Sequence, residues 1–327
     1  MTEVVIVTYN RLALLQECVD AVVRQTVPFS KIIIVDNAST DGTKVYLKSL
    51  ESDPLYQIIY EDENLGGAGG FYDGLAVAKQ DAPDYVLLID DDAILRVNYM
   101  EQLLQYATKH PDHAALAGTV MTDGVIDTNQ RRRLGSKLLF LEHRISEDAY
   151  RHDSFPCDMA TFCGMLINGR ALQQIGLPRK SYFLWYDDSE YSLRLGEFQS
   201  RRYPGLEENF YNRDSKKKGY AGIMVIPSAV LDHKTHLPKK EKGLLSRTTW
   251  RQYYGYRNRL DTAKQHFGML SSICISLEYT LLIFLSILQL FVPSKREHAR
   301  FNIDMIREAR NHGIEGKLGF NEKYQAK

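Results

Sequence analysis

Residues 3–8 (EVVIVT) and 31–36 (KIIIVD) are short runs rich in β-branched side chains, and both predict buried strands. The segment between them, residues 11–25, carries apolar side chains at the spacing of one helix face: Leu14, Leu15, Cys18, Val22 and Val23. A strand, a helix and a second strand in this order form a βαβ unit, in which the two strands are parallel.

The same alternation continues along the chain. Residues 56–60 and 85–89 read as further strands, and each follows a segment of helical character. We therefore expect an α/β fold with a Rossmann-like, mostly parallel sheet and helices on both faces. Ligands in such sheets bind beyond the carboxyl ends of the strands.

Composition limits the classes of partner. The chain has 327 residues with 41 basic and 41 acidic side chains, so its formal net charge is zero. Binding nucleic acid over a broad face needs an excess of Lys and Arg, and we expect no nucleic-acid partner. Any polyanion that the protein binds should be small.

The cysteines and the N-terminus bear on the compartment. The four cysteines are scattered without a CxxC pair, so we expect reduced, mostly buried thiols. The first strand begins at once, with no signal-peptide pattern ahead of it. Together these features predict a cytoplasmic protein.

Polar residues follow the first two strands. Thr8-Tyr9-Asn10-Arg11 could meet a nucleobase and a phosphate, and Asp36 could accept a hydrogen bond from a base N–H. Ser39 suits a helix N-cap, so a turn with a cap and no ligand explains the second cluster equally well.

A glycine-rich stretch follows the third strand. Asn64-Leu65-Gly66-Gly67-Ala68-Gly69-Gly70-Phe71 lies just before a helix that we expect to start near Tyr72. Because glycine has no side chain beyond hydrogen, the backbone N–H groups of Gly66, Gly67, Gly69 and Gly70 could approach a diphosphate closely at the helix N-terminus. Asn64 lies at the start of this stretch. A flexible loop is the alternative.

The fourth strand runs directly into Asp90-Asp91-Asp92. Adjacent carboxylates at the end of a buried strand repel one another unless a cation compensates them. In an extended segment Asp90 and Asp92 point the same way, so this pair predicts a Mn²⁺ or Mg²⁺ site, with Asp91 facing the sugar or a basic partner. A solvated acidic turn is the alternative.

Two later segments carry candidate side chains. In Phe183-Leu184-Trp185-Tyr186-Asp187-Asp188-Ser189-Glu190-Tyr191, aromatic faces suit sugar rings and Asp188 is the candidate base. Asp187 or Asp188 could instead cap the helix that follows. His233 and the nearby His236 are both candidate metal ligands. The Arg- and Lys-rich residues 201–222 predict a loop that could contact an acceptor.

The C-terminal part holds an apolar helix, residues 270–292, long enough to cross a bilayer. Ser271, Glu278 and Gln289 lie on one face of it, and basic residues are in excess on both sides. These features favour a helix lying on an anionic cytoplasmic membrane surface over one that spans it. A buried core helix is the alternative.

Taken together, these clusters resemble the family 2 inverting glycosyltransferases of the GT-A fold, over roughly residues 3–260. The glycine stretch and Trp185-Tyr186-Asp187-Asp188-Ser189-Glu190-Tyr191 look most like the galactofuranosyltransferase and rhamnosyltransferase branches. Mycobacterial-type galactofuranosyl enzymes carry an N-terminal β-domain before the first strand; we expect no such domain here, and acceptor recognition should then come from the loops and the C-terminal helices.

The resemblance implies roles for particular residues. Donor contacts would come from Asp36, the glycine stretch, Asp90, Asp91 and the Thr8–Arg11 segment, and metal ligation from Asp90, Asp92 and His233. Asp188 would be the general base, with Trp185, Tyr186 and Asp187 beside the acceptor.

The implied reaction transfers a sugar, best matched by galactofuranose from UDP-galactofuranose, to a hydroxyl of a lipid-linked or surface-polysaccharide glycan. A rhamnosyltransferase using dTDP-rhamnose and a non-catalytic nucleotide-sugar-binding module are the alternatives. A nucleotidyltransferase is disfavoured because residues 8–11 lack glycine. A membrane structural protein would leave the acidic clusters unexplained.

We expect residues 1–240 to form the nucleotide-sugar-binding and catalytic domain. Residues 241–327 should form a C-terminal helical membrane-associating region. The protein would then lie in the cytoplasm, peripherally associated with the inner face of the cell membrane.

Overall fold

The computed structural model describes residues 1–202, 222–236 and 249–325. Contacts divide the chain into two compact units. The first comprises Met1–Leu134, His143–Lys180 and Asp188–Leu237, and the second Gly135–Glu142, Ser181–Asp187 and Pro238–Lys327. The second unit thus takes in two short segments that the sequence analysis assigned to the catalytic domain. Most of the expected loop at 201–222 lies outside the described residues.

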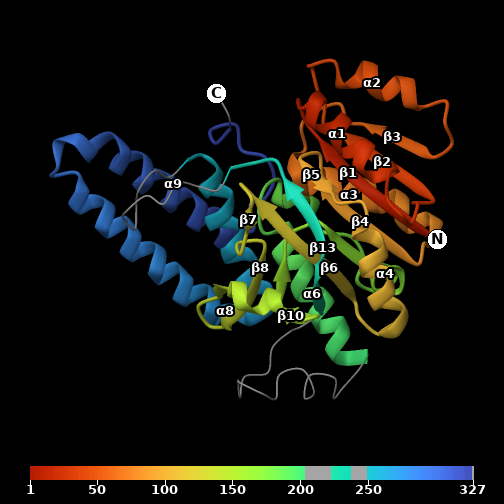
Figure 1. Ribbon diagram of the computed structural model, residues 1–327. Coiled ribbons are helices and arrows are strands. Elements are labelled where there is room, and N and C mark those ends of the chain that lie inside the picture. Colours follow the sequence, from red (N-terminus) through yellow and green to blue (C-terminus); the bar gives the residue numbers. More distant parts are fainter. Residues whose placement is uncertain (203–221, 237–248, 326–327) are drawn as a thin grey trace. The chain divides into compact units, whose positions relative to one another are not determined.

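The first unit is built on a large twisted sheet (Figure 1). Its first half has the order β4-β1-β2-β3, with all neighbours parallel: β1 (Thr2–Thr8), β2 (Lys31–Asp36), β3 (Tyr56–Tyr60) and β4 (Tyr85–Asp90). These are the four strands that the sequence predicted.

The second half of the sheet is mixed. Beyond β4 the order continues β12-β6-β13-β10, and β12 (Met165–Asn168) is antiparallel to both of its neighbours. The long β13 (Ile223–His233) is parallel to β6 (Ala115–Thr122). The remaining strands are short: β5 (Ala93–Leu95), β7 (Val125–Ile126), β10 (Phe155–Cys157), and the three-stranded sheet of β11 (Met159–Ala160), β8 (Arg131–Ser136) and β9 (Leu141–Arg144).

Helices cover both faces of the main sheet, as expected. One core joins alternate strand residues such as Ile6 and Ile34 to α1 (Leu12–Val23), α2 (Thr43–Leu50) and α4 (Tyr99–Lys109). The other core joins residues such as Val5 and Val35 to α3 (Gly66–Asp81), α5 (Gly169–Ile175) and α6 (Asp187–Arg202). Because both sides of each strand are buried, the strands read as continuous apolar runs.

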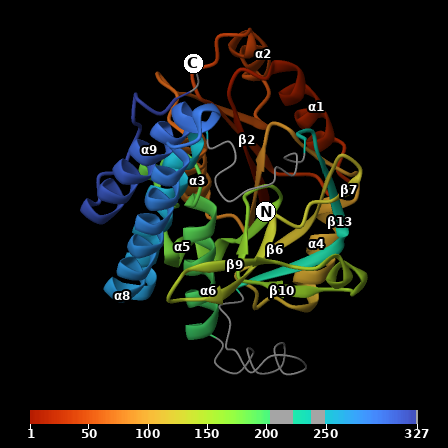
Figure 2. The same cartoon turned by 90° about the vertical axis from the view of Figure 1, so that its left-hand side faces the viewer.

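The second unit is helical. It contains α8 (Arg251–Gln289), the short η3 (Pro293–Lys295) and α9 (Arg296–Glu315), and α8 and α9 lie side by side in both views (Figures 1 and 2). Single turns of 3₁₀ helix also occur at η1 (Glu147–Arg151) and η2 (Lys180–Tyr182).

Candidate active site

The register of the parallel strands brings the first polar clusters to one edge of the sheet. Thr8 is paired with Asp36 across β1 and β2, and Val7 is paired with Asp90 across β1 and β4. Parallel strands that are level with one another end at the same edge, where the polar residues that follow them must gather.

Arg11 and two of the aspartates form the centre of this edge. Nη1 of Arg11 donates to Asp92 Oδ2 at 2.6 Å and to Asp91 Oδ1 at 3.3 Å, and the hydroxyl of Thr8 donates to Asp91 Oδ2 at 2.8 Å. Asp91 and Asp92 occupy a turn between β4 and β5 and not an extended segment. The expected alternation of side chains along an extended strand therefore does not apply to Asp91 and Asp92. Both carboxylates instead contact the guanidinium of Arg11.

The three carboxyl groups differ in charge state. Burial and the neighbouring Asp92 and Asp91 raise the pKa of Asp90 to about 7. Burial likewise raises the pKa of Asp91 to about 6, against the hydrogen bond from Thr8. Burial also opposes ionisation of Asp92, but His233 and Arg11 prevail and lower its pKa. Asp92 is thus the carboxylate most strongly held in its charged form.

β13 brings a histidine to this cluster. His233 is paired with Ala93 of β5 in the antiparallel register, which sets its Nε2 at 3.2 Å from Asp92 Oδ1. Burial lowers the pKa of His233, but the contact with Asp92 outweighs it, and the pKa is raised. His236 lies instead at the surface, where its Nδ1 is 2.8 Å from Asp123. Of the two candidate histidines, His233 is the one beside the aspartates.

A divalent cation fits part of the expected ligand set. His233 Nδ1 is buried without a hydrogen-bond partner, as a polar atom awaiting a ligand would be, and Asp92 Oδ1 has the 3.2 Å contact with His233 Nε2. However, no group of three or more His, Cys, Asp or Glu side chains in the described part of the chain is arranged to hold a metal. The guanidinium of Arg11 is the positive charge that contacts Asp92 here, and metal binding by Asp90, Asp92 and His233 stays a prediction.

The loops after β1 and β2 are tied to each other. Asn10, with a left-handed φ of 54°, accepts from Thr40 N at 2.7 Å and donates its own N–H to Ser39 Oγ at 2.9 Å. Asp36 Oδ1 accepts from Ser39 N at 3.0 Å. Tyr9 is 44% exposed, so its ring is available at this rim. These contacts order the loops where the sequence analysis placed a nucleobase.

The glycine stretch is helical and not a loop before a helix. α3 already begins at Gly66, whose N–H is accepted by Asn64 Oδ1 at 2.8 Å. A Cβ on Gly70 would lie 2.5 Å from Val7, whereas one on Gly67 would meet nothing within 4 Å. Gly70 therefore serves close packing on β1, and Gly67 is the glycine with open space in the first turn of the helix.

Asp188 lies in the first turn of α6 and has a basic neighbour. Its Oδ1 accepts from Ser189 N, and its Oδ2 is 3.9 Å from a guanidinium nitrogen of Arg132 on β8. The same guanidinium donates to Ser189 Oγ at 2.9 Å. The side chain of Asp188 is 18% exposed. Arg132 was not among the residues predicted from sequence; the Arg131-Arg132-Arg133 run was its one signal.

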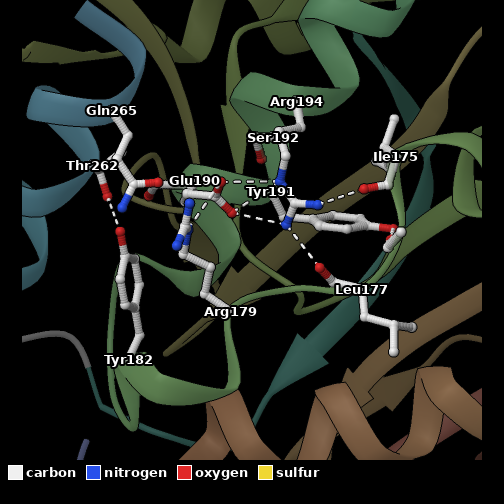
Figure 3. Close-up of polar contacts among 12 residues, drawn as sticks. Ile175, Leu177, Arg179, Tyr182, Glu190, Tyr191, Ser192, Arg194, Thr262 and Gln265 are labelled. Atoms are coloured by element: carbon white, nitrogen blue, oxygen red, sulfur yellow. Dashed lines mark hydrogen bonds and ion pairs between the residues drawn. The ribbon is translucent and has the colours of Figure 1, made fainter. Parts of the chain in front are cut away.

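A buried ion pair fixes the helix that carries Asp188 (Figure 3). Glu190, 1% exposed, accepts from Arg194 one turn later at 2.8–3.1 Å and lies 3.3 Å from Arg179. Arg194 also donates to the carbonyls of Ile175 and Leu177. The first turns of α6 are therefore locked to the segment that follows α5, another contact that sequence alone did not predict.

The three predicted acceptor residues belong to the second unit. Trp185 and Tyr186 have left-handed φ angles of 64° and 68°, which are uncommon for aromatic residues. The buried Asn258 of α8 holds this turn, because its Nδ2 donates to the carbonyls of Tyr182, Leu184 and Trp185 at 2.9–3.0 Å. Asp187, the third, is buried. Their proposed contact with an acceptor stays a prediction.

Solved structures share this fold. GalNAc-T7 with UDP, GalNAc and Mn²⁺ superposes with a TM-score of 0.58 at 12% identity, over 97% of this chain and 57% of that one. TarS 1-349 of S. aureus in complex with UDP has a TM-score of 0.50 at 14% identity, over 99% and 98%. At such identities the likeness shows the fold, and it confirms the expected GT-A type of α/β architecture.

Curated relatives match at higher identity over shorter stretches. Galactofuranosyltransferase GlfT1 of Mycolicibacterium smegmatis is 29% identical over 198 residues, which cover 58% of this chain and 64% of that protein. The O-antigen chain rhamnosyltransferase RfbN of Salmonella typhimurium is 32% identical over 114 residues, 35% of each chain. Glycosyltransferase GlyG of Streptococcus pneumoniae serotype 4 is 30% identical over 106 residues, 32% of this chain and 34% of GlyG.

A family model also matches the chain. The model of glycosyl transferase family 2 matches residues 3–176, more than half of the chain. This range contains the strand-end residues Thr8, Asp36 and Asp90 to Asp92 and the glycines of α3. The chain belongs to glycosyl transferase family 2.

Proposed function

We propose that this protein is an inverting glycosyltransferase that transfers a sugar, best matched by galactofuranose, from its UDP conjugate to a hydroxyl of a lipid-linked or surface-polysaccharide glycan. One observation carries the proposal: a family 2 chain gathers Asp36, Arg11 and the Asp91–Asp92 pair with His233 at one edge of its parallel strands. The likeness to GlfT1 supports galactofuranose, and the likeness to RfbN makes rhamnose from dTDP-rhamnose the alternative.

The donor would lie along this edge. Asp36 and the ordered loop of Thr8 to Arg11 would contact the base and ribose, and the first turn of α3, with Asn64 and Gly66 to Gly70, would receive the diphosphate. Helix N-terminal N–H groups favour anions, and Gly67 leaves room for one. Asp90 and Asp91 would face the sugar and the diphosphate.

A divalent cation, Mn²⁺ or Mg²⁺, would be held by Asp92 and His233, with Asp90 beside them. Bound there, it would neutralise the charge that develops on the departing diphosphate. For this, Arg11 must exchange its contact with Asp92 for a phosphate oxygen, a short movement for a side chain that is 47% exposed.

Asp188 would remove the proton from the acceptor hydroxyl. The hydroxyl oxygen then attacks the anomeric carbon from the face opposite the diphosphate, so that the anomeric configuration inverts. Arg132, beside the carboxylate of Asp188, would hold the base in position for this step. Trp185, Tyr186 and Asp187 would contact the acceptor glycan.

Substituting Asp188→Asn tests the assignment of the base. Because an amide cannot accept the proton, kcat for transfer should fall by about 10² to 10⁴ while donor KM stays within a few-fold of wild type. The measurement is steady-state transfer of galactofuranose to a synthetic glycan acceptor with Mn²⁺ present.

Asp153→Asn, an exposed aspartate outside the site, is the matched control and should leave both constants unchanged. Wild-type turnover in the Asp188→Asn variant would refute the role of this residue. Faster transfer from dTDP-rhamnose than from UDP-galactofuranose would replace the proposed donor by the alternative. Binding of donor without any turnover would favour the non-catalytic binding module.

The proposed lipid-linked acceptor indicates where in the cell the enzyme would act. A lipid-linked acceptor is made and held at a membrane, so we place the enzyme in the cytoplasm, peripherally associated with the inner face of the cell membrane. In support, α8 is the one helix in the described residues that is long and apolar enough to cross a membrane, and most of its apolar part is not buried.

A further inference from the structure

The second half of α8 exposes an apolar stripe. The helical residues concerned are large, 40–65% exposed, and recur at the spacing of one helix face: Met269, Leu270, Ile273, Leu277, Leu281, Phe284, Ile287 and Leu288. At a rise of about 1.5 Å per residue this part of the stripe is roughly 28 Å long, and the exposed Phe291 follows in the turn after the helix. Thr280 is the only polar residue within it. An unbroken stripe of this size marks an interaction surface.

The buried face of the same helix segment is the more polar one. It consists of Ser271, Ser272, Ile275, Tyr279, Ile283 and Ser286. Three of its hydroxyl groups are hydrogen-bonded inside the unit: Ser271 donates to Lys137 O, Tyr279 to Tyr256 O and Ser286 to Leu282 O. A helix in water places its apolar side inward. This inverted arrangement is instead suited to an apolar environment outside the protein.

A chain reversal at Gly268 separates this segment from the first half of α8. Gly268 has φ 83° and ψ −178°, which is not helical. Arg259 nevertheless contacts Glu278 at 2.9–3.0 Å, although an unbroken helix would hold residues this far apart in sequence at about 28 Å. The segment from Met269 to Gln289 is therefore a helix of its own, folded back on residues 251–267.

A row of arginines borders the apolar stripe. On α9, Arg296, Arg300, Arg307 and Arg310 form a row along the helix, and Glu297, Asp304 and Glu308 border this row on the side of the helix that is turned away from the buried face. Arg310 donates to Thr280 Oγ1 at 2.8 Å and Arg296 to Leu290 O at 2.9 Å. These two contacts fix the basic side of α9, which we call the arginine row, alongside the apolar stripe.

We propose that the apolar stripe and the arginine row together form a surface that binds an anionic lipid bilayer, with the helix lying in the plane of the interface. This sharpens the membrane association in the proposed function, but it rests on the second unit alone and not on the reaction. Apolar side chains enter the acyl boundary, while arginines contact lipid phosphates.

The same contacts exclude a spanning orientation. α9 runs along the apolar segment of α8 and carries the exposed Arg300, Asp304 and Arg307. If α8 crossed the bilayer, these charges would enter its hydrocarbon interior, which is strongly unfavourable. With the helix in the plane, they remain at the level of the headgroups.

Vesicle flotation of the full chain tests the surface. Wild type should float with vesicles of phosphatidylglycerol and phosphatidylcholine and bind less to phosphatidylcholine alone. The double variant Leu277→Glu, Leu281→Glu should bind at least about 10-fold more weakly, because two exposed leucines that would enter the bilayer are replaced by charged side chains. Arg300→Gln with Arg307→Gln should remove the preference for anionic vesicles. Val45→Glu, at a 74% exposed valine in α2, is the matched control and should bind as wild type does.

The depth of single tryptophans tests the orientation. In the variants Leu270→Trp, Leu277→Trp and Leu288→Trp, lipids brominated near the headgroup should quench the fluorescence of the added tryptophan to the same extent. The measured quantity is the quenching in each variant beyond that of wild type. A spanning helix would instead give deep quenching at residue 277 and shallow quenching at residues 270 and 288.

Three outcomes would overturn the proposal: no binding of wild type to anionic vesicles, undiminished binding of the Leu277→Glu, Leu281→Glu variant, or the spanning pattern of quenching. A dimer in solution that this variant dissociates, without vesicle binding by wild type, would show that a second copy covers the stripe. Asp188→Asn should bind vesicles normally, and the stripe variant should keep wild-type donor hydrolysis without vesicles. Failure of this proposal is therefore distinguishable from failure of the proposed reaction.

Discussion

At the residue scale, Glu3 is an acidic side chain within a central strand. It lies on β1, paired with Lys31 and Val86, and is fully buried. Burial and the nearby Asp81 raise its pKa to about 7, against the charge of Lys31. The folded protein therefore holds Glu3 protonated at pH values where the unfolded chain has released the proton.

This shift predicts a pH dependence of stability. Because the folded state binds the extra proton between about pH 4.5 and 7, the free energy of unfolding should fall as pH rises through that range. The loss should be about 1–3 kcal/mol. Glu3→Gln should remove it, so that urea denaturation at about pH 5 and pH 8 gives closer stabilities than in wild type.

Glu63→Gln, at an exposed glutamate, is the control and should keep the wild-type dependence of the free energy of unfolding on pH. The same dependence in Glu3→Gln would mean that the pKa of Glu3 is not raised in the folded protein.

Residue types alone identified the acidic cluster but not its partners. The sequence indicates that Asp90, Asp91 and Asp92 need positive charge, and a metal was the predicted source. Arg11 is 80 residues from Asp91, and its contact with Asp91 and Asp92 depends on the pairing of β1 with β4. Arg132 and Glu190 were missed for the same reason, since their partners are set by tertiary packing.

At the scale of elements, the glycines of α3 serve the contact between helix and sheet. A Cβ on Gly74 would lie 2.3 Å from Val5 and one on Gly70 2.5 Å from Val7. Real side chains do not approach so closely, so α3 sits nearer to β1 than alanine would permit. This close approach brings the start of the helix to the strand ends.

Gly74→Ala should therefore destabilise the protein although alanine favours helix. Relative to Gly67→Ala, which has open space on the same helix, its free energy of unfolding should be lower by about 1–3 kcal/mol. Urea denaturation measures both. Equal stabilities would show that the helix can move away from β1 without loss.

At the scale of the whole molecule, a ligand that binds only the folded protein should raise its stability. With Mn²⁺, UDP at about a hundredfold excess over its Kd should add about 2.7 kcal/mol to the free energy of unfolding. Chelation by EDTA should remove most of this gain, as should Asp92→Asn, whereas Asp153→Asn should keep it. Thermal denaturation with UDP, dTDP and GDP provides the measurement.

A larger gain with dTDP would favour the rhamnosyl alternative. An equal gain with EDTA present would argue against a metal between protein and diphosphate.

The apolar C-terminal helix shows where sequence and structure divide. The sequence located residues 270–292 and their polar seam, and Glu278 and Ser271 of that seam do make protein contacts. It could not reveal the reversal at Gly268 or the arginine row beside the stripe. Both depend on how α8 and α9 pack.

By itself the sequence determined the strand and helix alternation, the two-faced α/β fold and the family, because periodicity and short motifs are local properties of the chain. The tertiary structure alone decided which of two histidines meets Asp92, which arginine contacts Asp91 and Asp92, and that the glycines begin a helix. Each of these depends on contacts between residues distant in sequence, and such contacts exist only once strand register and helix packing are set.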